Sequence, residues 1–323
     1  LITGGAGMIG SRLVKLIVEK SYEVTVIDNL WRGKLKYLEN IKGFDVEKNF
    51  INQDLSVNNP FQILEKGMTF DYIIHLADIV AGIGYVFGNE GYIFNINNKI
   101  NSNVVKYALD INVDKFIYVG TACSFPKDLQ KGINSILRES DLFPADPESA
   151  YGWSKLIGSL EMRFLLKDSK IKNTTLMLHN VYGPNCDFSP GKSQVIPSLV
   201  YKSLTQSSDE SLVVWGSGKQ SRAFIHVDDV CDAIIKTLDC DDQLPEFLQI
   251  GPDNPITIGD LAKLIIKKSN VSRKIEYDIT KPTGDFGRGC SSELAKSFLR
   301  WKPKINIEDG IQNLVKWMSN ELG

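Results

Sequence analysis

The sequence predicts an α/β protein in which a doubly wound parallel sheet is joined to a smaller mixed α/β domain. Three apolar runs of strand length, at 24–27, 72–76 and 116–119, are continuous rather than alternating. Such runs are typical of strands buried on both faces of a sheet. Helix-like stretches separate them, and this alternation of strands and helices indicates a parallel sheet covered by helices on both faces.

The first half of the chain contains the elements of this sheet in a regular order. A strand stub at the start of the chain leads directly into an amphipathic helix at 9–19. Two further helices are expected at about 95–110 and at 150–166. The expected strands that follow the stub are 24–27, 72–76, 116–119 and 174–178.

The second half is interpreted as a smaller domain that exchanges segments with the first. After about residue 184, loops rich in Gly, Pro and Ser appear. The loops fall at 184–193, 215–221 and 280–289, and amphipathic helices at 258–268 and 307–318. We therefore place the first domain at residues 1–183, with segments of about 220–250 added to it, and the second domain at 184–323.

The composition is that of an ordinary globular protein with little net charge. The 323 residues include 37 basic and 39 acidic side chains, for a net charge of −2. Nucleic-acid binders normally carry a basic excess, and a membrane span needs about 18 apolar residues in a run, so neither partner is expected. Five scattered cysteines without a C-x-x-C pair argue against a disulfide framework or a zinc site and favour the cytoplasm.

Three glycines open the chain with the spacing Gly4-x-x-Gly7-x-x-Gly10, between the strand stub and the first helix. Gly4 allows a tight turn, Gly7 lets the backbone approach a pyrophosphate, and Gly10 lets the helix pack closely. The helix N-terminus, at Met8 and Ile9, would offer free N–H groups to phosphates. The pattern indicates a Rossmann-like dinucleotide-binding domain, with a plain glycine-rich turn as the alternative.

An acidic residue follows the second strand at the place where such domains bind the adenosine ribose. Asp28 comes about 20 residues after the glycines, and Asn29 and Leu30 follow it. A carboxylate there repels a 2′-phosphate and favours NAD over NADP, although Arg32 and Lys34 lie close enough to weaken this preference. Further on, Asp54 and Leu55 are expected to contact the adenine.

A phenol and an ammonium stand four residues apart at Tyr151 and Lys155. Positions i and i+4 share one face of a helix, so Lys155 is expected beside Tyr151, where it lowers the phenol's pKa and reaches the nicotinamide ribose. A phenol needs such a neighbour to act as a base at neutral pH. In isolation the pair would be ordinary surface chemistry, and the nucleotide loop upstream makes the catalytic interpretation the favoured one.

Thr121 and Cys123 follow the strand at 116–119, at the sheet edge where open α/β sheets bind ligands. Thr121 is expected to hydrogen-bond the reacting hydroxyl. If the extended geometry continues, Cys123 points to the same side as Thr121. Two interpretations of Cys123 stay open: a small buried core residue, or an acid or base at a sugar carbon.

Together these residues resemble the extended short-chain dehydrogenase/reductase family that acts on nucleotide sugars. The resemblance covers essentially the whole chain. Besides the loop and the residues above, it rests on His75-Leu76-Ala77, Asn180-Val181-Tyr182-Gly183-Pro184, Val195-Ile196-Pro197, Trp215-Gly216-Ser217-Gly218, Arg222-Ala223-Phe224-Ile225-His226-Val227-Asp228-Asp229-Val230 and Trp301-Lys302-Pro303. Within the family, residues 80–85 and 121–126 are most similar to the GDP-mannose 3,5-epimerases and GDP-fucose synthases.

The resemblance implies roles for individual residues. Tyr151 would take a hydroxyl proton while NAD⁺ takes hydride from sugar C4, and the 4-keto group would acidify the C3 and C5 protons for removal by Cys123. Leu76 and Ala77 would contact the cofactor. The residues implied to hold the sugar or diphosphate are Gly82, Asn180, Val195, Arg222 and Arg288.

The sequence departs from the family pattern at one important position. Fucose synthases carry a histidine acid just before the Val-Ile-Pro segment, whereas this chain has Gln194, which cannot donate a proton as an acid. Lys192 is a candidate substitute. The dehydratases of the family need a carboxylate just after the threonine, and Ala122-Cys123 supplies none, so dehydration is disfavoured.

We therefore expect an NAD-dependent nucleotide-sugar epimerase, with a GDP-linked hexose favoured and either C3/C5 or C4 epimerisation open. The alternatives are a nucleotide-sugar dehydrogenase or reductase and a catalytically silent NAD-binding regulator. The resemblance also implies a homodimer through the helices that carry Tyr151 and precede Thr121. His75, His179 and His226 stand alone in the sequence, so no metal site is expected, and His179 alone is a candidate for a site role.

Overall fold

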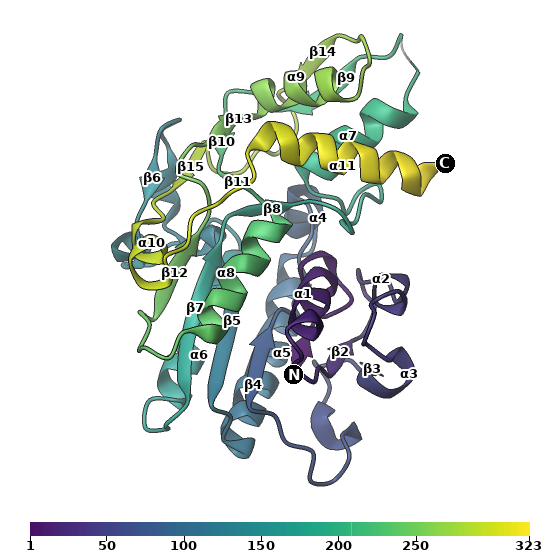
Figure 1. Ribbon diagram of the computed structural model, residues 1–323. Helices are drawn as coiled ribbons and strands as arrows, with labels where there is room; N and C mark the ends of the chain where they lie inside the picture. Colours follow the sequence, from purple (N-terminus) through teal and green to yellow (C-terminus); the bar gives the residue numbers. More distant parts are fainter. Residues whose placement is uncertain (208) are drawn as a thin grey trace.

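A computed structural model describes residues 1–207 and 209–323 (Figure 1). At its centre lies a parallel sheet of seven strands in the order β12-β7-β5-β4-β1-β2-β3. From β1 the chain winds outward to β3, then crosses back and continues from β4 in the other direction, which confirms the doubly wound α/β fold. The strands are β1 (Ile2–Thr3), β2 (Val26–Asp28), β3 (Phe50–Asn52), β4 (Tyr72–His75), β5 (Lys115–Thr121), β7 (Lys172–Leu178) and β12 (Phe247–Ile250).

The side chains of each strand fill two cores in turn, one on each face of the sheet. Ile74 and Ile117 pack in the core that contains Leu13 of the first helix. Their neighbours Ile73 and Phe116 pack in the core on the opposite face. Successive side chains of a strand point to opposite faces, so a strand buried on both faces requires a continuous apolar run.

Helices cover both faces of this sheet. On one face α1 (Met8–Glu19) packs along α8 (Val227–Asp239), and on the other α5 (Glu90–Ile111) packs along α6 (Ala150–Leu165). The Ser149 side chain accepts a hydrogen bond from the Gly152 N–H and so caps the start of α6. Shorter helices lie beside the sheet: α2 (Lys36–Glu39), α3 (Val46–Asn49) and α4 (Ile83–Gly88).

A second layer lies over the carboxyl ends of the sheet strands (Figure 1). Its core is formed mainly by three helices, α7 (Val195–Thr205), α9 (Ile258–Lys268) and α11 (Ile307–Leu322). Small sheets complete it: β13 (Ile256–Thr257), β10 (Ser221–Arg222), β15 (Gly287–Cys290) and β6 (Ile136–Leu137) in that order, β9 (Leu212–Trp215) with β14 (Ile275–Asp278), and β8 (Asn180–Tyr182) with β11 (Phe224–His226).

Segments are exchanged between the two halves of the chain. Strand β6, from the first half, pairs with β15 in the second layer. In return, α8 and β12 cover and extend the main sheet, and α10 (Glu293–Leu299) packs against both of them. The domain boundary between residues 183 and 184 stays a prediction. Segments from each half of the chain pair with strands of the other half, so no single position separates the two.

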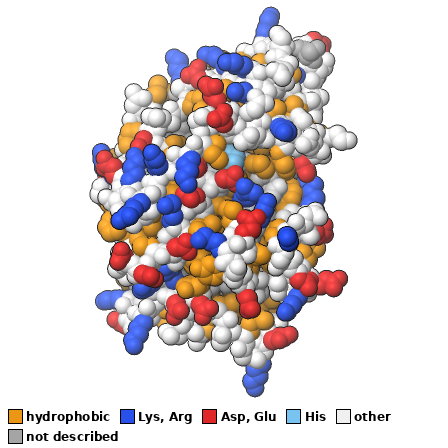
Figure 2. Space-filling model, in the orientation of Figure 1, with side chains coloured by type: hydrophobic (Ala, Val, Ile, Leu, Met, Phe, Trp, Pro, Cys, Tyr) orange, Lys and Arg blue, Asp and Glu red, His pale blue; other side chains and the backbone are white. Residues whose placement is uncertain are grey.

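The surface carries mixed charges. Figure 2 shows Lys and Arg side chains interspersed with Asp and Glu across the face it presents. None of the helices in the described part of the chain combines the length and apolar character that crossing a bilayer requires. In residues 1–207 and 209–323, no group of three His, Cys, Asp or Glu side chains is placed to hold a metal ion.

Candidate active site

A cleft of about 700 Å³ opens where the carboxyl ends of the sheet strands face the second layer. Open parallel sheets bind ligands at this edge, because the loops after their strands gather there. Every residue predicted for the site lines this cleft except Leu30 and Lys192, which line a smaller hollow beside it. The placement of these residues is observed, and their roles stay predictions.

The glycine loop has the geometry that a dinucleotide site requires. Gly4 has φ +71°, and a Cβ on it would lie 2.8 Å from the Ala77 nitrogen. A Cβ on Gly10 would lie 2.2 Å from the Gly4 carbonyl oxygen, so the close approach of α1 to the turn needs a glycine there. Gly7 is the N-cap of α1 and leaves the first-turn N–H groups directed at the cleft. This cradle therefore fits the phosphates of a dinucleotide.

Asp28 stabilises this loop and faces the cleft. Its carboxylate accepts hydrogen bonds from the Ala6 N–H at 3.0 Å and the Leu30 N–H at 2.7 Å. Burial raises the pKa of Asp28, and these two hydrogen bonds oppose the rise. The backbone of Leu30 turns here with φ +59°, and its side chain packs against the main core instead of lining the cleft.

Arg32 is held by groups on the far side of the cleft. Its Nε donates to the Asp187 carboxylate at 3.2 Å, and its Nη1 donates to the Val80 carbonyl. The sequence left Arg32 as a possible partner of a 2′-phosphate. The guanidinium of Arg32 is therefore already paired with a carboxylate in this structure.

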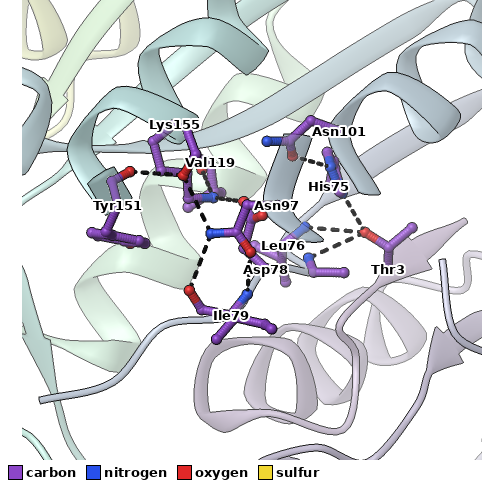
Figure 3. A network of polar contacts seen from close by, with 12 residues as sticks. Thr3, His75, Leu76, Asp78, Ile79, Asn97, Asn101, Val119, Tyr151 and Lys155 are labelled. Carbon is purple, nitrogen blue, oxygen red and sulfur yellow. Dashed lines mark hydrogen bonds and ion pairs between the residues drawn. The ribbon is translucent and has the colours of Figure 1, made fainter. Parts of the chain in front are cut away.

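Thr121, Tyr151 and Lys155 lie together in the cleft. Tyr151 stands in the first turn of α6, and a Cβ on its neighbour Gly152 would lie 2.2 Å from the Cys123 carbonyl, so α6 packs directly on the end of β5. The Thr121 side chain lies close enough to the phenol to influence its pKa. The Lys155 ammonium donates to the Val119 carbonyl at 2.6 Å and forms an ion pair with Asp78 (Figure 3).

The expected effect of Lys155 on Tyr151 is wrong for this structure. Burial raises the pKa of Tyr151 well above its usual value, and Cys123 and Asp78 add to the rise, whereas Thr121 opposes it. The reason is that Lys155 is drawn to the carboxylate of Asp78 rather than to the phenol. Sequence reasoning missed Asp78, although it directly follows the His75-Leu76-Ala77 segment.

The extended geometry expected from Thr121 to Cys123 is also wrong. The strand ends at Thr121, and residues Ala122–Ser124 form a 3₁₀ turn in which the Thr121 hydroxyl accepts a hydrogen bond from the Cys123 N–H. Cys123 nevertheless lines the cleft. There the Arg288 Nη1 donates a hydrogen bond to its sulfur at 3.0 Å. This contact directs the sulfur and offers a positive partner to a thiolate.

Two arginines from the second layer enter the cleft side by side. Arg222 and Arg288 are register partners on the parallel strands β10 and β15. Burial, together with the charge of Arg288, lowers the pKa of Arg222 to about 10. Arg288 is anchored by Gln130, at 2.5 Å from its Nε, and by Asp285. A pair of neighbouring guanidiniums suits a ligand with several phosphate oxygens.

Glu148 is a further acid that sequence reasoning missed. It lies three residues before Tyr151, lines the cleft, and accepts a hydrogen bond from the Asp285 N–H at 3.0 Å. Burial raises the pKa of Glu148, and Asp285 adds to the rise. The signal in the sequence that could have identified Glu148 is its position three residues before Tyr151.

The segment with Lys192 and Gln194 closes over Gly82. The Gly82 N–H donates to the Lys192 carbonyl at 2.8 Å, and a Cβ on Gly82 would lie 2.3 Å from the Ser193 oxygen. Gln194, the N-cap of α7, lines the cleft, whereas the Lys192 ammonium lies over the Trp31 ring at 4.9 Å. Lys192 is therefore poorly placed to replace the missing histidine acid.

The three histidines differ in position. His75 bonds Thr3 and Asn101 in the core, and His226 caps α8. His179 lines the cleft and bonds Gln249 at 2.9 Å, and burial lowers its pKa to about 4. It is thus neutral at physiological pH.

Fold and cleft together define a class: an α/β enzyme with a dinucleotide cradle beside a tyrosine and a lysine. Residues 1–251 match the model of the NAD dependent epimerase/dehydratase family, and the chain belongs to this family.

Named relatives agree with this assignment. GDP-mannose 3,5-epimerase 1 of Oryza sativa subsp. japonica is 27% identical over 321 residues, which cover 99% of this chain and 82% of the relative. GDP-L-fucose synthase 1 of Arabidopsis thaliana is 29% identical, over 98% of this chain and 91% of the relative. Among solved structures, UDP-glucose 4-epimerase from Thermotoga maritima, solved with UDP-glucose, superposes with a TM-score of 0.86 at 24% identity, over 100% of this chain and 99% of that chain. At this identity the last likeness concerns the fold.

Proposed function

We propose that the protein is an NAD-dependent nucleotide-sugar epimerase that acts through a transient 4-keto sugar. The observation that carries the proposal is that Tyr151, Thr121 and Cys123 line the same cleft as the glycine loop and the paired Arg222 and Arg288. When bound, the nicotinamide supplies an acceptor that takes hydride from sugar C4 and later returns it. A GDP-linked hexose is favoured, because the relatives named above include two enzymes of GDP-sugars.

Tyr151 serves as the base for the sugar hydroxyl. It takes the O4 proton as the C4–H bond is broken, and it returns this proton when the ketone is reduced again. Thr121, which lines the same cleft, orients the sugar hydroxyl beside the phenol. Lys155 holds the ribose of the cofactor, and Arg222 and Arg288 bind the diphosphate, so that the sugar lies between the two groups.

Cys123 and Glu148 are the groups available for epimerisation at C3 or C5. The 4-keto group makes these protons acidic, and the sulfur held by Arg288 removes one of them. Reprotonation from the other face needs a second acid. Glu148 lines the cleft and has a raised pKa, so we assign this role to it in place of Lys192.

The function is tested with a panel of GDP-, UDP- and dTDP-hexoses. We expect a GDP-hexose to raise the melting midpoint most, since a ligand that binds only the folded state stabilises it. That sugar should then be converted to an epimer without net change in the reduced-nicotinamide absorbance. Stoichiometric absorbance change would instead indicate a dehydrogenase or reductase, and binding without conversion a silent NAD-binding protein.

Replacement of Cys123 separates the two kinds of epimerisation. In deuterated water, C3/C5 epimerisation incorporates deuterium at ring carbon, whereas C4 epimerisation, which the presence of Gln194 would favour, does not. We expect C123S to lower the rate of deuterium incorporation by about 100-fold, because a serine hydroxyl is a far weaker acid than a thiol. E148Q should reduce net epimerisation while exchange at one face persists. C240S, outside the cleft lining, is the control; full activity of C123S would leave C4 epimerisation as the function.

We also propose that the protein is a homodimer formed through α5 and α6. These helices pack against each other, and outside the cleft they expose Phe94, Trp153 and Phe164, the last with 69% of its surface accessible. Closed two-fold dimers are the commonest oligomers. Light scattering at micromolar concentration should give twice the mass of the chain, and F164E should shift it towards the monomer; a monomeric parent protein would contradict the proposal.

A cytoplasmic location stays a prediction, in keeping with five free cysteines.

A further inference from the structure

The carboxylate of Asp78 is buried in the wall of the cleft, between β4 and α6. Its side chain is 2% exposed, and that of its partner Lys155 is 4% exposed. Among the described residues, Lys155 is the one group that pairs with this carboxylate. A buried carboxylate normally gathers several donors, because removing it from water is costly. Asp78 therefore depends on a single ammonium.

The backbone that follows Asp78 is held in place. The Asn97 side chain, from α5, accepts a hydrogen bond from the Ile79 N–H at 2.7 Å and donates to the Ile79 carbonyl at 3.2 Å (Figure 3). The same amide donates to the Ser154 hydroxyl at 3.3 Å, which joins this loop to α6. These hydrogen bonds join the loop after β4 to α5 and α6, and they hold Asp78 beside Lys155.

The ammonium of Lys155 contacts three groups. Its ammonium donates to the Val119 carbonyl, pairs with Asp78, and lies 4.8 Å from the centre of the Tyr118 ring. The phenol of Tyr151 has Thr121 and Cys123 as neighbours. The positive charge that would stabilise a Tyr151 phenolate is therefore largely offset by the carboxylate of Asp78.

We propose that Asp78 is a positioning residue that holds Lys155 in place and controls how much of its charge reaches Tyr151. The inference rests on the role of Tyr151 proposed above. Burial raises the pKa of Asp78 to about 6, even though Lys155 opposes the rise, so the carboxylate remains ionised at neutral pH. Above that pH, its negative charge disfavours the phenolate form of Tyr151.

Other titratable and charged groups face this pair from the neighbouring elements, and they must be considered in any pH profile. His75 of β4 stays neutral, because burial lowers its pKa to about 3, and Tyr118 of β5 stays protonated, because burial raises its pKa. Two further titratable or charged side chains, those of Cys123 and Arg32, face Tyr151. Asp78 is therefore the neighbour of Lys155 whose charge changes in the accessible pH range.

The first measurement uses the protein without cofactor. With carboxyl-¹³C-labelled aspartate, the Asp78 resonance, assigned by its loss in D78N, should show a titration step near pH 6. In K155M this step should move upward by at least about 1 pH unit, because the ammonium that favours the charged form is lost. A step that does not move in K155M shows that the ion pair has no energetic weight and overturns the proposal, whatever the reaction of the enzyme.

The second measurement follows reduced nicotinamide in a single turnover across pH. In D78N the acid limb of the rate profile should move to lower pH by about 1 unit, since a negative charge beside Tyr151 is removed. D78E, which keeps the charge, should retain the limb of the parent. An unmoved limb in D78N would overturn the positioning role, and a profile without any tyrosine-dependent limb in the parent would instead overturn the proposed base.

A matched control separates positioning from stability. Asp229 is a buried carboxylate outside the cleft lining, where it accepts hydrogen bonds from the Lys304 and Ile305 N–H groups at 2.9 and 3.0 Å. D229N should lower the melting midpoint without moving the pH limb. If D78N is too unstable to assay, D78E also removes the Asp78 resonance from the aspartate-labelled protein and assigns the titration step. The K155M titration then decides the question.

Discussion

Tyr151→Phe should lower the rate of hydride transfer by about 1000-fold, because it removes the proposed base for the sugar hydroxyl proton. The aromatic ring stays, so the fold and the affinity for NAD⁺ should change little. The appearance of reduced nicotinamide in a single turnover measures the first quantity, and a binding titration measures the second. A rate within tenfold of the parent would assign the base to another group.

Tyr182→Phe is the matched control for this experiment. Burial raises the pKa of Tyr182 as it does that of Tyr151, but Tyr182 is 1% exposed and lies outside the cleft lining. Removing its hydroxyl should leave hydride transfer unchanged. A loss of activity in both variants would indicate a general effect of tyrosine removal on packing.

Gly10→Ala should abolish tight cofactor binding and destabilise the fold. The added methyl group would lie 2.2 Å from the Gly4 carbonyl oxygen and 2.5 Å from the Gly5 Cα, so either α1 or the phosphate loop must move. We expect the free energy of unfolding to fall by about 2 kcal/mol. Affinity for NAD⁺, measured by calorimetry, should fall by at least about 10-fold, a loss of 1.4 kcal/mol or more.

Gly91→Ala provides the control for this loop prediction. Gly91 lies near the start of α5, and a Cβ there meets nothing within 4 Å. This variant should keep its affinity for NAD⁺ and a stability within about 0.5 kcal/mol of the parent. Normal cofactor binding by Gly10→Ala would show that the turn tolerates the methyl group and that the cradle is less rigid than its contacts imply.

Local patterns in the sequence were sufficient to predict strands β1, β2, β4, β5 and β7 and several helices, but not β3, β12 or α8. The runs at 72–76 and 116–119 became β4 and β5, because a strand between two cores needs apolar side chains in both directions. The helix at 258–268 was predicted with its observed bounds. The helix predicted at 95–110 begins earlier, at Glu90, since helix ends depend on neighbours as well as on period.

The candidate site was predictable where one motif carried one function. The loop of Gly4, Gly7 and Gly10 and the pair of Tyr151 and Lys155 have spacings set by a turn and by a helix, and both line the cleft. The 3₁₀ turn at Cys123 was not predictable from spacing, because it depends on how α6 packs against the end of β5.

The amino-acid sequence by itself determined the alternation of strands and helices in the first half of the chain, the glycine loop and the family, since each depends on residues close together in the chain. Only the tertiary structure decided which charged side chains of the cleft lie next to one another. It paired Lys155 with Asp78, set Arg222 beside Arg288 through the register of β10 and β15, and brought Arg288 to the thiol of Cys123. Charges act through space over a few ångströms, and residues 77 or 165 positions apart come within that range only after folding.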